Sequence, residues 1–116
     1  MTIEILKGSA QRSDLVDSGT VARPLGATVC CTSVRALDGV ASHQMGVWEC
    51  TPGSYERQIV NAELMHVLGG RSTFTPVGGE PLRIEAGDTV FFPAHTEGRW
   101  DIHELMRKVY VVLPQD

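Results

Sequence analysis

The chain has 116 residues, 42% of them apolar and 21% charged, which predicts one packed domain and leaves no room for two independent cores. The formal net charge is −4 and no Lys/Arg run is present, so a nucleic-acid binder is not expected, because phosphate neutralisation needs clustered cations. No apolar run approaches the ~20 residues of a membrane helix and the first residues lack the pattern of a secretory signal, so we expect a cytoplasmic protein with no membrane partner.

The first 25 residues differ from the rest of the chain. Residues 9–17 predict one or two helical turns, and residues 18–20 end them. Residues 23–26 then predict a loop. We interpret residues 1–25 as an N-terminal arm that packs against a main domain at residues 26–116.

From residue 28 onward the chain consists of short extended segments separated by glycine or proline. A turn is expected at residues 37–39, and the glycines at 69–70, 78–79 and 87 lie where hairpins must reverse with positive φ. No helical period is sustained in this part of the chain, so the pattern indicates an all-β sandwich or barrel. Nine strands are expected, at residues 28–35, 44–50, 55–60, 64–68, 71–75, 82–84, 89–92, 98–101 and 104–113.

The three cysteines make a poor disulfide framework. Their number is odd, and Cys30 and Cys31 are adjacent, so in an extended strand they point to opposite faces. Together with Cys50 they are interpreted as reduced, partly buried thiols. The alternative is a reactive thiol, but no adjacent histidine or basic residue is present to lower a thiol pKa.

Two stretches resemble the paired motifs of the cupin superfamily. Residues 63–70, E-L-M-H-V-L-G-G, are similar to its first motif, and residues 87–95, G-D-T-V-F-F-P-A-H, are similar to its second. Residues 46–53, Trp100 and residues 107–112 resemble one branch in particular. That branch contains the small single-domain cupins grouped with ureidoglycine aminohydrolase and the ethanolamine-utilisation cupin.

The resemblance implies a single cupin barrel, a jelly roll of the RmlC-like kind, with the N-terminal arm as an addition. A small barrel of this type leaves space for one small-molecule ligand at its mouth. Small cupins commonly pair, and the arm offers strands to exchange, so a homodimer is expected.

The metal-binding positions of the cupin motifs are largely altered in this chain. Many cupins bind one metal through two histidines and a glutamate in the first motif and a histidine in the second. Here the histidine positions hold Arg57, Ile59 and Gly98, and only Glu63 matches. A divalent site generally needs three or four donors, so no cofactor and no metal are predicted at this position, although alternative donors stay possible. His66 is expected to point to the opposite face from Glu63.

Five side chains are candidates for binding a ligand: Glu49, Arg57, Glu63, Trp100 and Lys108. Arg57 and Glu63 are expected on the inner face as an ion pair, which is either a structural replacement for the metal or an electrostatic handle for a polar ligand. Glu49 is either a pocket carboxylate or a charge at the rim. Lys108 is either an inward charge paired with Glu49 or Glu63, or a charge that protects a sheet edge. Trp100 either lines the barrel mouth or packs in the core.

These features predict a small-molecule-binding cupin without the usual metal, such as a sensor or an accessory to a metabolic enzyme. The alternative is an enzyme that acts on a small polar nitrogenous or carboxylate metabolite, as the resemblance to ureidoglycine aminohydrolase implies. In that case Glu49 or Glu63 would transfer the proton, and Lys108 or Arg57 would hold the anionic group. A third possibility is a purely structural dimer.

Overall fold

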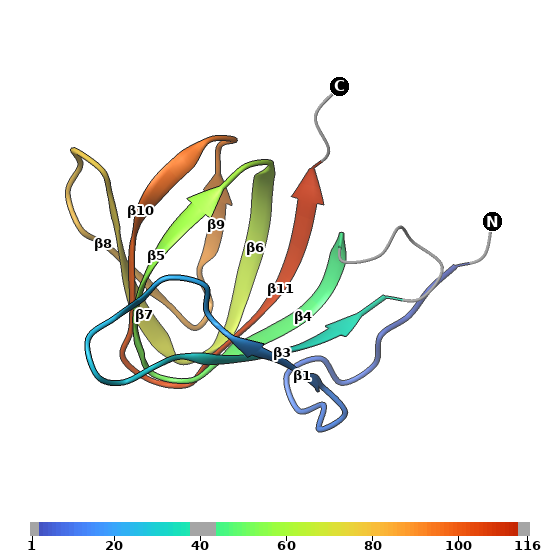
Figure 1. Cartoon of the computed structure of the whole chain (residues 1–116). Helices are drawn as coiled ribbons and strands as arrows, with labels where there is room; N and C mark the ends of the chain where they lie inside the picture. Colours follow the sequence, from blue (N-terminus) through green and yellow to red (C-terminus); the bar gives the residue numbers. More distant parts are fainter. Residues whose placement is uncertain (1–2, 38–43, 114–116) are drawn as a thin grey trace.

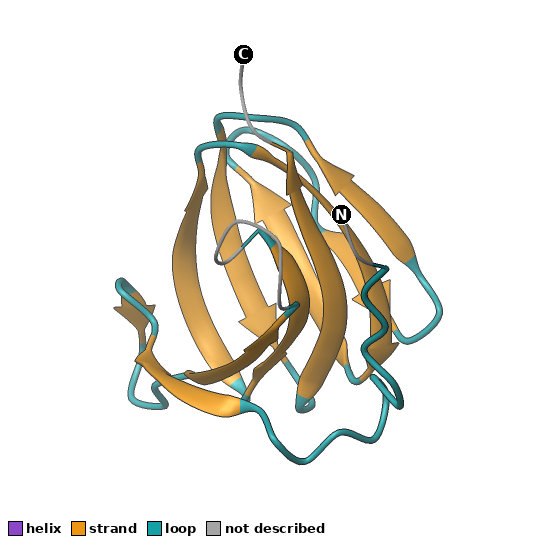
Figure 2. Cartoon of the chain, turned by 90° about the vertical axis from the view of Figure 1, so that its right-hand side faces the viewer, coloured by secondary structure: helices purple, strands orange, loops and turns teal. Residues whose placement is uncertain are grey.

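The computed structural model describes residues 3–37 and 44–113, and every described residue lies in a strand, a turn or a loop (Figures 1 and 2). Six strands form one antiparallel sheet in the order β1-β3-β4-β11-β6-β9, and five form a second sheet in the order β2-β5-β10-β7-β8. The all-β fold predicted from the sequence is therefore confirmed. The strands are β1 (Val16–Thr20), β2 (Pro24–Leu25), β3 (Cys31–Ala36), β4 (Met45–Cys50), β5 (Gly53–Ile59), β6 (Ala62–Gly69), β7 (Arg71–Pro76), β8 (Leu82–Glu85), β9 (Thr89–Phe92), β10 (Thr96–Ile102) and β11 (Met106–Leu113).

The core lies between the two sheets, which curve toward one another as a barrel (Figure 1). Strand alternation produces it, because successive side chains point to opposite faces of a sheet. In β6, for example, Met65 and Val67 are buried, whereas Leu64 and His66 are exposed. Both sheets contribute to one apolar cluster centred on Trp100, so the barrel has a single core.

The nine strands predicted from the sequence are all present, with bounds that differ by a few residues. Gly70, Gly78 and Gly87 have φ values of 82°, 74° and 95°, as expected where hairpins reverse. Gly69 and Gly79 do not have positive φ, so one residue of each glycine pair provides the left-handed conformation. The turn expected at residues 37–39 lies largely outside the described residues.

The helical turns expected at residues 9–17 are absent. A single turn is closed by the N–H of Gln11 and the carbonyl of Gly8, at 2.9 Å, and β1 follows. The pairing of β1 with β3 shifts register between Asp17 and Gly19, where the Asp17 carboxylate accepts the Gly19 N–H at 2.8 Å. Only Val16 and Asp17 of this segment belong to a strand, and residues 12–15 have no regular structure. The prediction was wrong because a short helix is marginal unless tertiary packing stabilises it.

The loop expected at residues 23–26 contains β2, which pairs with β5. The residues before position 26 therefore supply one strand to each sheet, β1 to the first and β2 to the second. Within the described residues the arm and the barrel form one hydrogen-bonded unit. The domain boundary between residues 25 and 26 stays a prediction.

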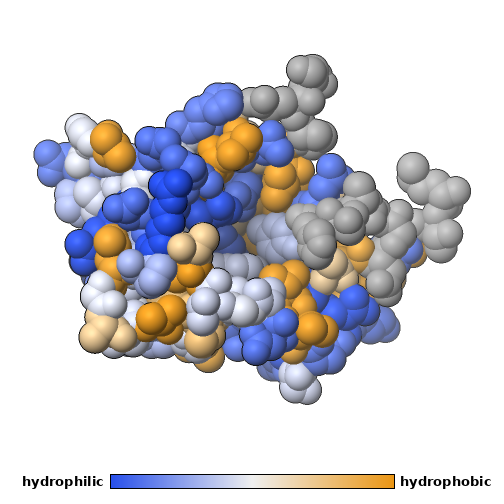
Figure 3. Space-filling view, in the orientation of Figure 1, coloured by the Kyte–Doolittle hydropathy of each residue, from blue (hydrophilic) through white to orange (hydrophobic). Residues whose placement is uncertain are grey.

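The outer face of β5 and β10 is hydrophilic, as Figure 3 shows on the left of the view. On this face Gln58 donates a hydrogen bond to Glu97 across the two strands, at 2.9 Å. The part of the chain that the structure describes contains no helix with the length and hydropathy to span a membrane. The cytoplasmic location stays a prediction.

Candidate functional site

A cavity of about 530 Å³ opens between β5 of one sheet and β4, β6 and β11 of the other. Its volume falls in the range of about 300–1,000 Å³ that is typical of small-molecule sites. Residues 21–23 of the arm close one side of it. The side chains of the barrel that matter most for its chemistry are Trp48, Tyr55, Arg57, Glu63, Lys108 and Tyr110.

Arg57 and Glu63 form an ion pair on the cavity wall. The Nη2 of Arg57 lies 2.7 Å from the Oε2 of Glu63, and the Nη1 of Arg57 donates to the carbonyl of Gln58 at 2.9 Å. The side chain of Glu63 is 9% exposed and that of Arg57 is 37% exposed. Since a buried carboxylate is strongly destabilising without a partner, the pair explains how Glu63 is tolerated inside the barrel. The predicted inward pair is thus present.

Lys108 lies deeper in the same cavity and is 4% exposed. Its Nζ lies 3.5 Å from the Sδ of Met65, 4.3 Å from the ring centroid of Trp48 and 4.9 Å from that of Trp100. No carboxylate of residues 3–37 or 44–113 forms an ion pair with Lys108. The structure thus places Lys108 inward, as one of the two alternatives predicted, but without the expected ion pair.

Burial is the main cause that lowers the pKa of Lys108, to about 8 from 10.5, because a desolvated ammonium is destabilised. The positive charge of Arg57 lowers this pKa further, whereas the negative charge of Glu63 and the thiol of Cys50 raise it. The Tyr110 pKa is raised, first by burial and then by Glu63. These groups therefore interact electrostatically inside one poorly solvated space.

Trp100 lies one layer below the cavity and does not line it. It is 1% exposed and packs against Tyr55, Phe74 and Phe92, with ring centroids 6.3, 5.4 and 5.5 Å away. Its indole Nε1 is buried and has no hydrogen-bond partner in the described part of the chain. The geometry matches the core-packing alternative, and Trp100 contacts the cavity through the lining residues Lys108, Trp48 and Tyr55.

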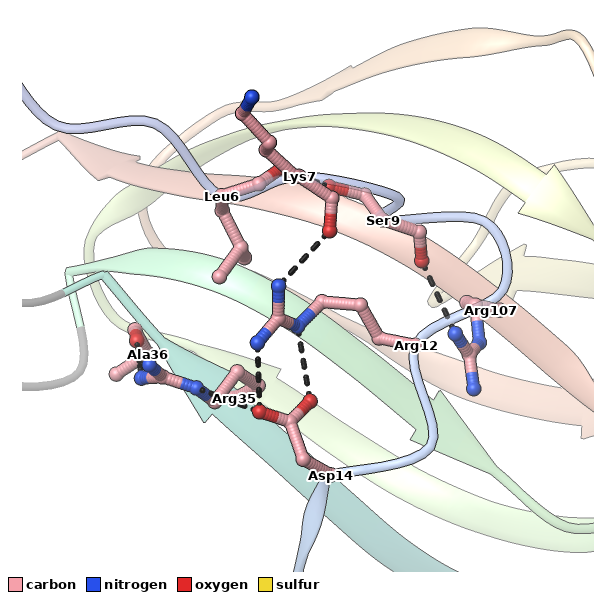
Figure 4. Close-up of polar contacts among 8 residues, drawn as sticks. All are labelled: Leu6, Lys7, Ser9, Arg12, Asp14, Arg35, Ala36 and Arg107. Carbon is pink, nitrogen blue, oxygen red and sulfur yellow. Dashed lines mark hydrogen bonds and ion pairs between the residues drawn. The ribbon is translucent and has the colours of Figure 1, made fainter.

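Glu49 does not reach the cavity, which corrects the expectation of a pocket carboxylate. Lys108 pairs across the strands with Trp48, so these two side chains share the inner face. Glu49 therefore points outward, where its Oε2 lies 2.8 Å from the Nη2 of Arg107. Arg107 in turn donates to the carbonyl of Ser9 at 3.0 Å, a contact between the barrel and the arm that Figure 4 shows.

The residues present do not fit the metal set of the cupin motifs. Gly98 lies opposite Arg57 in the β5–β10 pairing, and Arg57 binds Glu63, so three of the four motif positions do come together. A Cβ at Gly98 would lie 2.5 Å from the carbonyl of Thr75, so a side chain at this position would clash. Among the described residues no group of three His, Cys, Asp or Glu side chains could hold a metal ion.

Several cavity residues, among them Trp48 and Tyr110, were not candidates at the sequence level. Trp48 lines the cavity because it pairs with Lys108, and Tyr110 lines it because it follows Lys108 by two residues on the same face. The period of two along β11 was a signal for Tyr110. No sequence signal identified Trp48, because the face of β4 that points inward depends on its register with β11.

The cysteines lie away from the cavity lining. Cys30 and Cys50 are buried and Cys31 is exposed, so the adjacent pair does point to opposite faces as predicted. All three thiols are free. Burial raises the pKa of Cys30 and of Cys50, which disfavours the reactive thiolate at both positions. His66 is exposed on the outer face, as expected, and its Nδ1 contacts the hydroxyl of Thr89 at 2.8 Å.

Comparison with known proteins identifies a family of cupins. The model of the EutQ-like cupin domain matches residues 37–110. A solved DUF861 family protein from Thermotoga maritima is 28% identical, with a TM-score of 0.58, over 60% of this chain and 80% of that one. A DUF861 family protein of unknown function from Pseudomonas syringae pv. tomato is 25% identical, with a TM-score of 0.74, over 85% of this chain and 44% of that one.

The EutQ protein of Clostridium difficile shares the fold, with a TM-score of 0.63 and 17% identity over 75% of this chain and 71% of that one. This chain therefore spans less than half of the Pseudomonas protein but most of the other two. No protein among the curated ones matches.

Proposed function

The chain belongs to the EutQ-like cupin family, and we propose that it binds a small anionic metabolite, a carboxylate, in the cavity between its sheets. The observation that carries this proposal is Lys108, a buried cation that lines the cavity and forms no ion pair with the described residues. A bound anion would provide the negative charge that the described residues do not place against Lys108.

The charges around the cavity support an anionic rather than a cationic ligand. Three cationic side chains line it, Arg23, Arg57 and Lys108, and two carboxylates, Glu56 and Glu63, so one positive charge is in excess. Carboxylates suit this site because a guanidinium offers several N–H donors in a fixed plane. Arg57 uses two of its nitrogens on Glu63 and Gln58 and remains partly exposed toward the cavity.

The loss of the cupin metal positions gives the second line of support. Where a metal would bring positive charge to a ligand, this barrel has Arg57 and Lys108 instead. Lys108 lies in a space of low solvation, where the attraction between a cation and a carboxylate is much stronger than in water, and Arg57 is partly exposed beside it. The ligand-binding roles that we propose are therefore those of Arg57 and Lys108, with Glu63 orienting Arg57.

A thermal-shift screen with small mono- and dicarboxylates tests this proposal. A ligand at a hundredfold excess over its Kd stabilises the folded state by about 2.7 kcal/mol, or about 10 °C for a domain of this size. We expect such a shift for at least one carboxylate, lost in Lys108→Met and kept in the outer-face variant Glu49→Gln. If no carboxylate shifts the midpoint, or if Lys108→Met keeps the full shift, the proposal is wrong.

The alternative is an enzyme acting on a nitrogenous or carboxylate metabolite, of the ureidoglycine aminohydrolase kind. The observation that favours it is that Glu63 lies in the same cavity as Lys108, so a carboxylate and an amine face the same ligand. Conversion of a bound ligand, followed by NMR and abolished in Glu63→Gln, would distinguish turnover from binding alone.

The homodimer stays a prediction. A row of apolar side chains crosses four neighbouring strands on the outer face of the six-stranded sheet: Phe91 pairs with Leu64, Leu64 with Val111, and Val111 with Met45. Phe91 and Leu64 are exposed, whereas Val111 and Met45 are half-buried. Pairing of two chains through this row would cover it. Light scattering on the purified protein, with Leu64→Glu as the matched variant, measures the oligomeric state directly.

A further inference from the structure

We propose that Lys108 is a nucleophilic amine that forms an imine with a small 2-oxo acid in the cavity. The inference rests on the proposed carboxylate site and adds a reacting group to it. A 2-oxo acid carries both features that the cavity would recognise: a carboxylate for Arg57 and, next to it, a ketone carbon for the Nζ of Lys108.

The contacts of Lys108 are those of an amine rather than of an ion-paired ammonium. A lysine ammonium has three N–H donors, and the only acceptor that the described residues offer to Nζ is the thioether sulfur of Met65 at 3.5 Å. A thioether is a weak acceptor, so most of the hydrogen-bonding capacity of the charged form is unused. Loss of one proton removes the buried charge and one unused donor, and it frees a lone pair on the Nζ of Lys108, which lines the cavity.

Burial is the main cause that favours the neutral amine of Lys108, and the positive charge of Arg57 adds to it. The negative charge of Glu63 has a larger effect than that of Arg57 and favours the ammonium, but burial prevails. With a pKa of about 8, about a tenth of the Lys108 amine is neutral at pH 7, compared with about one in 3,000 for a free lysine side chain. A depressed pKa of this kind activates lysines that react with carbonyl compounds.

The two tryptophan rings next to Nζ suit the product of the reaction. An imine formed in water is largely protonated, and its positive charge would lie where the rings of Trp48 and Trp100 now contact Nζ, at 4.3 and 4.9 Å. Aromatic faces attract a cation without accepting its proton. The same rings would therefore hold the amine before the reaction and the iminium after it.

The reaction needs no oxidant, reductant or metal. The lone pair of Nζ adds to the ketone carbon, the C–N bond forms, and the carbonyl oxygen takes up a proton to give a carbinolamine. The hydroxyl then leaves as water with a second proton, and the C=N bond forms. In total, one amine and one ketone give one imine and one water.

Reductive trapping with pyruvate as the probe tests the proposal on the intact protein. Cyanoborohydride reduces an imine to a stable secondary amine, which intact mass and peptide mapping locate. The sequence contains two lysines, Lys108 and the exposed Lys7, so Lys7 serves as an internal control. We expect Lys108 to be labelled at pH 7 at least about tenfold faster than N-acetyl-lysine, and we expect its labelling rate to level off above about pH 8.

Three variants and one matched ligand complete the test. Lys7→Met should leave the fast labelling unchanged, and both Lys108→Met and Lys108→Arg should abolish it. Lactate has the carboxylate of pyruvate but no ketone, so it should shift the unfolding midpoint without forming an adduct.

The possible failures are distinguishable. If pyruvate and lactate both shift the midpoint but Lys108 is not labelled, or is labelled no faster than N-acetyl-lysine, the imine proposal is overturned and the carboxylate site stands. If neither ligand shifts the midpoint and no adduct forms, both proposals are overturned.

Discussion

The arm and the cavity each contain a carboxylate that binds an arginine, but the two carboxylates differ in their access to water. Where the arm meets β3, Arg12 and Arg35 both contact the carboxylate of Asp14, at 2.6 and 3.3 Å (Figure 4). In the cavity, the carboxylate of Glu63 binds Arg57 and acts electrostatically on Lys108. In both regions one carboxylate interacts with two cationic side chains.

The difference lies in access to water. The side chain of Asp14 is 50% exposed, so water solvates this carboxylate and screens its ion pairs. Lys108 is 4% exposed, so the extra cation of the cavity has only a sulfur and two aromatic rings around it. Water stabilises the charges around Asp14, whereas the ammonium of Lys108 lacks this stabilisation. The cavity and not the arm is therefore the candidate site.

The largest effect on stability is expected for Lys108→Met. The pKa of Lys108 is about 8 in the folded state and about 10.5 in the unfolded state, so the unfolded state binds more protons between these values and stability rises with pH. Relative to the Met variant, the wild type should gain about 3 kcal/mol of unfolding free energy between pH 7 and pH 10.5.

Urea unfolding of both proteins at several pH values measures this gain. The difference between the two proteins is the informative quantity, because ionisation of the cysteines in the unfolded state contributes equally to both. A difference that stays constant over this pH range would mean that Lys108 is charged and stable in the fold.

The next test compares the inner and the outer carboxylate. Glu63→Gln leaves Arg57 without its partner and removes the nearest negative charge from Lys108, so it should lower the unfolding free energy by about 2 kcal/mol, less than for a fully buried pair because Arg57 is partly exposed. Glu49→Gln should cost about 1 kcal/mol through the loss of the contact with Arg107.

The two variants should also differ in a property that packing alone would not change. Glu63→Gln should lower the pH at which Lys108 is half labelled by pyruvate and cyanoborohydride, because the negative charge that raises the pKa of Lys108 is gone. Glu49→Gln should leave that pH unchanged. Equal pH profiles in both variants would contradict the separation of inner and outer charges.

The smallest effect is expected for Asp14→Asn. The Arg12 guanidinium holds the pKa of Asp14 at about 2, below its usual 3.8, so the stabilising contribution of Asp14 is complete above pH 4 and is lost as the pH falls toward 2. Because the carboxylate is exposed, the urea midpoint at pH 7 should move less than in Glu49→Gln. The shift of the unfolding midpoint that a carboxylate ligand causes should be the same as in the wild type. A weaker shift would mean that Asp14 affects ligand binding in the cavity.

The sequence predicted the barrel better than the site. Glycine and proline punctuation and the two motif stretches were enough for nine strands and their hairpins, because these signals are local. The helical turns predicted at residues 9–17 failed because a short helix needs tertiary packing, which a local pattern does not encode. Period two placed Glu63 and His66 on opposite faces, and the cupin resemblance identified the face of Glu63 as the inner one, as the structure shows.

By itself, the sequence determined which residues of one strand share a face, which glycines turn the chain and which motif positions had lost their metal ligands. Only the tertiary structure decided which face of β4 points inward, and hence that Trp48 and not Glu49 accompanies Lys108. The physical reason is register: alternation fixes the relative orientation of side chains within a strand, but the pairing of distant strands fixes which side is the core. Of the two carboxylates expected to pair with Lys108, Glu49 lies on the other side of the sheet, where it binds Arg107, and Glu63 binds Arg57.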